Sequence, residues 1–299
     1  MRRPSKPLIA LSTRAQLDLM LAPYVIGLVL LVLAPLLITL ALAFTQYDLF
    51  SAPRWYWIDN FRGFTVDRLF QRALYNSLWF ALIAVPVRVT AALVLALLLN
   101  KPGRAFAATR AALYLPAIIP DVAYALAWLL ILNPGFGPLN LALQALGLPG
   151  WPWLQTPVTA RASLIVMWVF QLGEGFVLLL AARQTLSADL FESAALDGAS
   201  RWQAFRRLTL PLLAPALLLL CIRDTVLSFQ GAFVAATVAT GTGPYYTTYF
   251  LPHYIFDESF GLFKYGYGSA ATVVMYGVTA VLIGLYYSAF KLASRSDEF

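Results

Sequence analysis

A run of 29 residues without a charge, from Leu19 to Tyr47, is the feature that most limits how this chain can fold. A helix crosses a bilayer core with about 20 apolar residues, so this run is long enough to span it. Further apolar runs follow, and of all 299 residues 61% are hydrophobic and only 12% are charged. Soluble domains carry about a quarter charged residues, so this chain must place its apolar surface in lipid. Because the runs are continuous rather than alternating, they favour helices over a β-barrel.

Six segments are predicted to cross the membrane as helices within a single transmembrane domain that covers 1–299. Their approximate bounds are 22–44, 73–99, 111–132, 162–182, 208–237 and 269–290. The sequence therefore predicts an all-α integral membrane fold with six transmembrane helices. The first run follows Arg2, Arg3, Lys6 and Arg14, and it is longer than the apolar core of a signal peptide, so we interpret it as an uncleaved helix.

Positive charge is unevenly shared between the two sides of the membrane. With the N-terminus inside, thirteen of the 21 Lys and Arg residues lie in inside segments and five lie in outside loops. Lys and Arg are enriched on the cytoplasmic side, so both termini and the loop 183–207 are expected in the cytoplasm. The net charge of +7 is thus a topology signal, and we expect membrane lipid but no nucleic acid as a partner.

The inventory of reactive residues argues against several functions. A Gly-x-x-x-x-Gly-Lys-Ser/Thr phosphate loop is absent, so the chain is not expected to bind or hydrolyse ATP itself. One His and one Cys are too few for a metal centre or an internal disulfide. Cys221 is expected to pack as a small hydrophobe, and His253, which follows Pro252 in an outer loop, is expected to be solvated or interfacial. The chain is therefore predicted to be no enzyme and to bind no cofactor.

The cytoplasmic loop 183–207 carries two predicted helices. Ser187 can cap a helix over Ala188–Asp197, which Gly198 ends. A second helix begins at Ser200 with the capping box Ser200-x-x-Gln203 and leads into the fifth span at Pro211.

One face of the first of these helices is small and smooth. Phe191, Ala194, Ala195 and Gly198 lie on it at helical spacing, bordered by two acids. Such a face suits insertion into a groove of another protein. It also suits an amphipathic connector that lies on the inner leaflet.

Charged residues inside apolar spans are costly and mark functional candidates, here Arg88, Asp121, Glu174, Arg223 and Asp224. We expect Arg88 to pair with Asp121 across the second and third spans. Arg223 is expected to pair with Asp224 or Glu174. Whether these groups are structural or line a path is left open.

Polar residues beside aromatic ones recur in the fourth and fifth spans, as hydroxyl-bearing ligands require. From this chemistry we assign Gln171, Glu174, Asp224 and Gln230 to a solute path. Gly173 and Gly175 weaken their helix by about 1 kcal/mol each and are expected to open a gap in its wall.

The segment Glu192-Ser193-Ala194-Ala195-Leu196-Asp197-Gly198, followed by Leu208-Thr209-Leu210-Pro211, resembles the EAA loop of binding-protein-dependent ABC importer permeases. Three further segments resemble signatures of its maltose-type, carbohydrate branch: Asn76-Ser77-Leu78, Leu115-Pro116 and Gly266-Tyr267-Gly268-Ser269-Ala270. Ser193 replaces the usual first Ala of the loop, and the large periplasmic insertion of the maltose prototype is missing.

The resemblance implies a type I ABC importer permease fold in a prokaryotic plasma (inner) membrane. It implies three partners: an ABC ATPase dimer that binds ATP and Mg, a second homologous permease subunit, usually a different chain, and an extracytoplasmic solute-binding protein. It assigns coupling to the ATPase to Glu192, Ser193, Ala194, Ala195, Asp197, Gly198 and Pro211. Glu192 would pair with a basic residue of the ATPase.

The same resemblance carries solute contacts over to Gly173, Phe176, Thr225, Ser228 and Phe229. The expected solute is a sugar or a related polyhydroxylated compound, and a polyol or glycerol phosphate is an alternative. A secondary transporter without an ATPase is less favoured, because the sequence has no internal repeat and the loop motif would have no use in it. A membrane enzyme is less favoured because clustered His, Cys or acidic residues are lacking. A passive scaffold is left open.

Overall fold

The computed structural model describes residues 12–295 of the chain. Arg2, Arg3 and Lys6, which are expected on the cytoplasmic side, lie outside the described residues. Four helices are long and apolar enough to cross a membrane, over 14–42, 68–98, 201–240 and 265–292. Two bent helix pairs pass the same test, so six crossings result if each pair crosses once. The all-α membrane fold expected from the sequence is confirmed.

The spanning elements follow the chain order. They are α1 (Thr13–Leu28), the π-helical turn η1 (Val29–Leu33), α2 (Ala34–Leu42), α4 (Arg68–Leu98), α5 (Arg104–Ile118), α6 (Asp121–Ile131), α8 (Pro157–Phe170), α9 (Gly173–Gln184), α12 (Leu210–Thr240) and α14 (Tyr265–Arg295). Shorter elements connect them: β1 (Thr45–Gln46), β2 (Arg54–Trp55), α3 (Asp59–Gly63), α7 (Pro138–Ala145), α10 (Ala188–Leu196), α11 (Arg201–Ala204), η2 (Phe205–Thr209), α13 (Leu251–Phe256) and η3 (Asp257–Gly261).

The third and fourth spans, each predicted as one helix over 111–132 and 162–182, are bent pairs of helices. Helices α5 and α6 meet at a bend of 106°. Pro120 has no N–H to continue α5, and it forces Ile119 into an extended conformation with ψ of 131°. Helices α8 and α9 are bent by 46° around Gln171 and Leu172. At each bend some backbone N–H and C=O groups lose their helical hydrogen bonds. In an apolar region these groups must be hydrogen-bonded to other parts of the protein.

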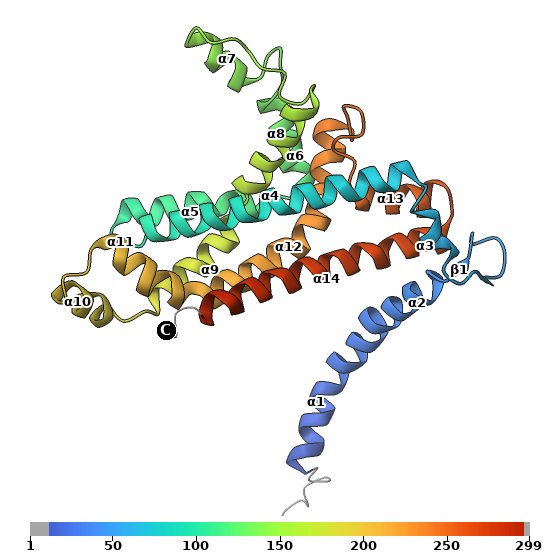
Figure 1. Ribbon diagram of the computed structural model, residues 1–299, viewed down its shortest axis with the longest axis horizontal. Coiled ribbons are helices and arrows are strands. Elements are labelled where there is room, and N and C mark those ends of the chain that lie inside the picture. The colour runs from blue at the N-terminus through green and yellow to red at the C-terminus, as the bar shows by residue number, and fades with distance from the viewer. Residues whose placement is uncertain (1–11, 296–299) are drawn as a thin grey trace, which may run out of the picture.

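Two buried apolar clusters hold the bundle together. One, around Val85, Phe176 and Leu220, joins α4, α9 and α12. The other, around Phe70 and Tyr254, joins α4 to α13 and the start of α14 at the opposite end from α10 and α11 (Figure 1). At that end β1 and β2 pair as a two-residue antiparallel ladder.

The first spanning helix diverges from this bundle. In Figure 1, α1 and α2 leave the end of the bundle near α3 and point away from the other helices. The most apolar window of this helix has none of its residues buried. Its apolar surface therefore faces lipid or another chain.

The single histidine of the chain is buried, so of the two expected environments, solvated or interfacial, the solvated one is wrong. His253 is 4% exposed between the end of α12 and α13. Its Nδ1 accepts from the Phe250 N–H at 3.1 Å, and its Nε2 lies 3.1 Å from the Thr237 hydroxyl. Burial lowers the pKa of His253 to about 4, although the nearby Asp257 carboxylate opposes this shift. The fold therefore holds the ring in its neutral form.

The buried ring predicts a pH-dependent stability. Because the pKa of His253 in the fold is about 4 against an ordinary value of 6.5, its contribution is complete above pH 6.5 and is lost as the pH falls towards 4. The loss approaches about 1.4 kcal/mol of unfolding free energy per pH unit. Thermal unfolding of purified protein in detergent, from pH 7 to 4, should show a steeper decline for wild type than for His253→Gln. Parallel profiles would contradict the neutral buried ring.

Candidate functional site

The loop 183–207 forms the two helices predicted from the sequence. The Ser187 hydroxyl accepts from the Asp189 N–H at 3.2 Å and caps α10. Gly198 ends this helix with φ of +78°, a left-handed conformation that favours glycine. The Gly198 N–H bonds to the Ala195 carbonyl at 3.1 Å, and the Ala199 N–H bonds to the Ala194 carbonyl at 2.9 Å. This pair of bonds is a Schellman motif, which fixes where the chain leaves α10.

The second helix of the loop is continuous with the fifth span. The capping box at the start of α11 is present, with the Ser200 N–H bonded to Gln203 Oε1 at 2.7 Å. From α11 the chain continues through the π-helical turn η2 into α12 as one helix over 201–240. As the sequence predicts, this second helix leads into the fifth span at Pro211, and the helix runs through the proline without a stop. The wider turn immediately before Pro211 accommodates the missing proline N–H.

The loop projects from one end of the bundle with an exposed surface (Figure 1). Glu192, Ser193 and Ala195 are exposed, and within residues 12–295 the Glu192 carboxylate forms no ion pair. The Arg183 guanidinium lies 4.1 Å from the Phe191 ring and ties α10 to the end of α9.

Three large apolar residues of the loop, Leu190, Leu196 and Trp202, are exposed, and reasoning from the sequence assigned no role to their side chains. Leu196 is 89% exposed and Trp202 is 66% exposed. Their size and their place beside the EAA-like segment are signals that could have identified them. Large apolar side chains in an otherwise polar loop are typical of a protein-binding surface.

Four charged side chains form a chain of opposite charges through the apolar interior. Arg88 Nε on α4 lies 3.6 Å from Asp224 Oδ2 on α12, and Asp224 Oδ1 lies 3.3 Å from Arg223 Nη1. Arg223 also pairs with Glu174 on α9. The side chains of Arg88 and Asp224 are 7% and 1% exposed, whereas those of Arg223 and Glu174 are 31% and 49% exposed. This charge chain therefore runs from the core to the surface of the bundle.

The expected pairing of Arg88 with Asp121 is wrong. Asp121 lies exposed at the first position of α6, just beyond the bend at Pro120, which turns this helix away from a straight course. The expected partners of Arg223 are both confirmed. The sequence could not identify Asp224 as the partner of Arg88 because the choice depends on how the helices pack.

Arg88 also supplies a hydrogen-bond donor to the backbone where the fourth span is bent. Its Nη2 donates to the Gln171 carbonyl at 2.7 Å, a carbonyl at the bend between α8 and α9. The guanidinium carbon lies 4.3 Å from the centre of the Trp168 ring, so the charge is covered by an aromatic face. On α6, the Tyr124 hydroxyl donates to the Met167 carbonyl at 2.7 Å. Two side chains thus supply partners for the backbone around this bend.

The glycines of the fourth span do not open a gap, contrary to expectation. A Cβ on Gly173 would lie 2.9 Å from the Leu113 carbonyl of α5. A Cβ on Gly175 would lie 2.9 Å from the Leu220 side chain of α12. Both glycines instead permit close helix packing.

The residues predicted to line a solute path fall into two groups. Gly173, Phe176, Asp224, Thr225, Ser228 and Phe229 are buried within the chain's own packing. The Thr225 hydroxyl donates to the Cys221 carbonyl at 2.7 Å, and the Ser228 hydroxyl donates to the Thr225 carbonyl at 2.8 Å. Their contact with a solute stays a prediction, and it would require these helices to separate.

The second group forms an exposed polar face. Glu174 and Gln230 are exposed, and Gln171 is half-buried. Gln171 lines a small cavity of about 20 Å³ together with Asp121 and Gly231. The structure thus leaves Glu174 on α9 and Gln230 on α12 exposed, and it brings Gln171 beside Asp121 of α6.

Known proteins match this chain over most of its length. Residues 68–292 match the family described as binding-protein-dependent transport system inner membrane component. The chain is 34% identical over 269 residues to the probable ABC transporter permease protein YesP of Bacillus subtilis strain 168, covering 89% of this chain and 85% of that protein. It is 30% identical over 271 residues to the sulfoquinovosyl glycerol transport system permease protein SmoG of Agrobacterium fabrum, covering 90% and 88%.

A solved structure resembles the whole fold. It is a bacterial alginate ABC transporter in complex with alginate pentasaccharide-bound periplasmic protein. The TM-score is 0.76 at 25% sequence identity, and the match covers 91% of this chain and 92% of that chain.

Because Arg88 lies at the buried end of the charge chain, its substitution should strongly lower the free energy of unfolding. Arg88→Met would leave the buried Asp224 carboxylate with the partly exposed Arg223 as its remaining ion-pair partner in residues 12–295, and it would remove the donor to the Gln171 carbonyl. Together these losses should cost about 3–5 kcal/mol of unfolding free energy. Adding Asp224→Asn should restore part of this loss, because the two changes are coupled. Thermal unfolding of the purified protein measures both.

The matched control is Arg62→Met, which breaks an exposed pair with Asp59 at 3.0 Å. Its expected cost is below about 1 kcal/mol. Equal losses for Arg88→Met and Arg62→Met would argue against a stabilising intramembrane pair.

Proposed function

The chain belongs to the binding-protein-dependent transport system inner membrane component family, and on this premise we propose that it is the permease subunit of an ATP-driven importer of a sugar or a related polyhydroxylated solute. It crosses the membrane several times as a transport subunit. The inner membrane of a prokaryote is the proposed location, and a partner ATPase binds the ATP and Mg.

The continuous helix over 201–240 is the observation that carries this proposal. It joins the exposed loop directly to the span that holds Asp224 and the predicted solute contacts. Glu192 is an exposed acid without an ion-pair partner in residues 12–295, ready to meet a basic residue of the ATPase. Ser193, Ala194, Ala195, Asp197 and Gly198 form the docking surface around it, and a force applied there reaches the fifth span through Pro211.

The charge chain links this movement to neighbouring helices. Arg88, Asp224 and Glu174 come from α4, α12 and α9, so a displacement of α12 acts on both other helices. Separation of α9 from α12 would expose Phe176, Thr225, Ser228 and Phe229. These residues would then contact the passing solute.

A second, homologous permease subunit completes the path. Glu174, Gln230 and Asp121 lie exposed in apolar segments, and polar groups in spans face protein or water rather than lipid. A second subunit over this face would enclose a polar passage. The unpacked α1–α2 helix offers it a further apolar surface. We propose a heterodimer with a solute-binding protein on the outer face, since the similar alginate transporter forms a complex with a periplasmic protein that holds its pentasaccharide.

The charge balance of the polar face favours a neutral solute. Arg223 is matched by both Glu174 and Asp224, so the exposed end of the charge chain has no uncompensated positive charge for an anion. Hydroxyl groups can bond to carboxylate, amide and guanidinium groups alike.

Reversal of the Glu192 charge should uncouple transport. Glu192→Lys would place a positive charge opposite the basic residue of the ATPase, so solute uptake should fall to background. Uptake in cells, with the amount of inserted permease measured in parallel, checks this. The matched control is Asp189→Lys, an exposed acid on the same helix, which should transport normally. Wild-type uptake by a normally inserted Glu192→Lys variant would refute the coupling role.

The exposed polar face should also matter for uptake. Glu174→Gln and Gln230→Ala alter exposed side chains, so the amount of inserted permease should be unchanged. Uptake should fall by about tenfold, which corresponds to the loss of one good hydrogen bond to the passing solute. Val281→Ala on α14, at a side chain 64% exposed, is the control at an apolar surface position. Effects no larger than this control would remove these residues from the path.

A further inference from the structure

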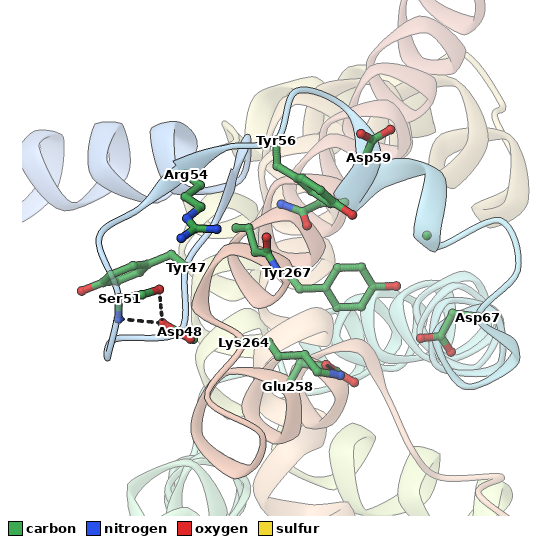
Figure 2. A pocket seen from close by; sticks show the side chains of 13 residues that line it. Tyr47, Asp48, Ser51, Arg54, Tyr56, Asp59, Asp67, Glu258, Lys264 and Tyr267 are labelled. Carbon is green, nitrogen blue, oxygen red and sulfur yellow. Dashed lines mark hydrogen bonds and ion pairs between the residues drawn. The ribbon is translucent and has the colours of Figure 1, made fainter.

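A polar cavity of about 630 Å³ opens at the end of the bundle opposite α10. Its walls are β1, the segment through β2 to α3, the turn η3 and the start of α14 (Figure 2). Because the loop 183–207 is expected in the cytoplasm, this cavity lies on the outer side. Its volume is in the range of small-molecule sites, which is roughly 300–1,000 Å³.

Close backbone packing pre-forms the walls. A Cβ on Gly266 would collide with the Thr45 carbonyl of β1, and a Cβ on Gly268 would collide with the Ser259 hydroxyl of η3. The Asn60 side chain donates to the Ala43 and Thr45 carbonyls at 2.9 and 2.8 Å. Gly266 and Gly268 thus bring α14 against β1 and η3, and they place Tyr267 in the cavity wall.

Three loop residues beside the cavity hold a backbone conformation that is unusual for their type. Leu49, Trp57 and Phe263 have φ of 71°, 51° and 56°. Each follows or precedes a residue that lines the cavity, namely Asp48, Tyr56 or Lys264. Such left-handed backbone costs about 1–3 kcal/mol per residue and gathers at ligand clamps.

Part of the polar lining is already satisfied by the protein. The Tyr254 hydroxyl donates to Asp67 Oδ2 at 2.6 Å, and Lys264 Nζ lies 3.2 Å from Glu258 Oε2. Burial raises the pKa of Asp67, but the hydrogen bonds from Tyr254 and from the Phe70 and Leu69 N–H groups outweigh it and hold this pKa below its ordinary value. Asp67 is therefore a charged acceptor at neutral pH.

Other polar groups that line the cavity have no partner. The side chains of Arg54, Tyr56 and Gln46 form no hydrogen bond or ion pair within the described part of the chain. Figure 2 shows Arg54 and Tyr56 reaching towards the cavity from the segment around β2, across from Lys264 and Glu258. A pre-formed cavity thus presents a guanidinium, a phenol and an amide that remain available to a ligand.

The lining indicates the class of that ligand. Tyr47, Tyr56 and Tyr267 supply aromatic rings, while carboxylate, amide and guanidinium groups bond to hydroxyls. The carboxylates outnumber the cations, Arg54 and Lys264, so an anion is disfavoured. A neutral, hydroxyl-rich molecule satisfies the available donors and acceptors best.

We propose that this cavity, the outer sugar site, binds one neutral sugar unit of the solute on the extracytoplasmic side of the permease. The identity of the ligand rests on the proposed function. The site is separate from the predicted path. Arg54, Tyr56 and Tyr267 belong to the outer loops and the start of α14, whereas the path residues lie at the bend between α8 and α9, on α9 and on α12.

Binding can be measured without transport. The purified permease complex in lipid nanodiscs, free of ATP and of binding protein, is titrated with maltose, lactose and trehalose and followed by saturation-transfer NMR. At least one of these sugars should bind saturably, and Arg54→Ala and Tyr56→Ala should each weaken binding by about tenfold, the loss of one good hydrogen-bonding partner. The matched control is Arg72→Ala, an exposed outer arginine that does not line the cavity, and it should bind as wild type.

Several results would overturn the outer sugar site. They are no saturable binding of any of the three sugars, equal affinity in wild type and Arg54→Ala, or tighter binding of sn-glycerol 3-phosphate than of the neutral sugars. Unfolding temperatures of the variants confirm that each is folded. Glu192→Lys should bind sugar normally while its uptake is lost. If uptake depends on Glu192 but Arg54→Ala has no effect on binding, the outer site fails and the proposed function stands.

Discussion

The contact between Arg88 and Asp224 is the interaction on which the middle of this structure depends. An isolated charge in an apolar interior has a high desolvation cost. The attraction between these two opposite charges, 3.6 Å apart, offsets much of that cost for both. Another donor of Arg88 bonds to the Gln171 carbonyl at the bend of the fourth span, where the regular helix is interrupted. One side chain therefore neutralises a carboxylate, caps a broken helix and connects three spans. The irregular backbone at this depth is possible because that side chain is there.

Much of the fold followed from the sequence because lipid leaves few options. Charge-free runs of sufficient length must be helices, and the uneven distribution of Lys and Arg orients them. The structure of the loop 183–207 could be predicted almost residue by residue, since Ser187, Gly198 and the Ser200–Gln203 pair act on their immediate neighbours. Local chemistry of this kind requires no knowledge of the tertiary packing.

What the sequence left undetermined depends on contacts between distant segments. Gly173 and Gly175 weaken a helix in isolation, but only the positions of Leu113 and Leu220 show that they are packing sites. Histidine is a polar residue type, and a position after a proline in a loop suggests exposure. His253 is buried because α13 folds back on α12. The bend at Pro120 could have been inferred from the proline alone, and it would have removed Asp121 from the candidates for Arg88. The predicted solute contacts are buried here, and residue type could not distinguish buried from exposed polar positions on one helix.

In the proposed transport cycle, the continuous helix over 201–240 would act as a lever. Forty residues at about 1.5 Å each give a length of roughly 60 Å, more than the thickness of a membrane. Arg223 and Asp224 attach it to its neighbours near the middle of that length, so they serve as a fulcrum. When the end near Trp202 tilts inwards, the end near Thr240 must swing outwards. Under the coupling proposed above, a single pull on the loop 183–207 would close one mouth of the bundle and widen the other in the same movement.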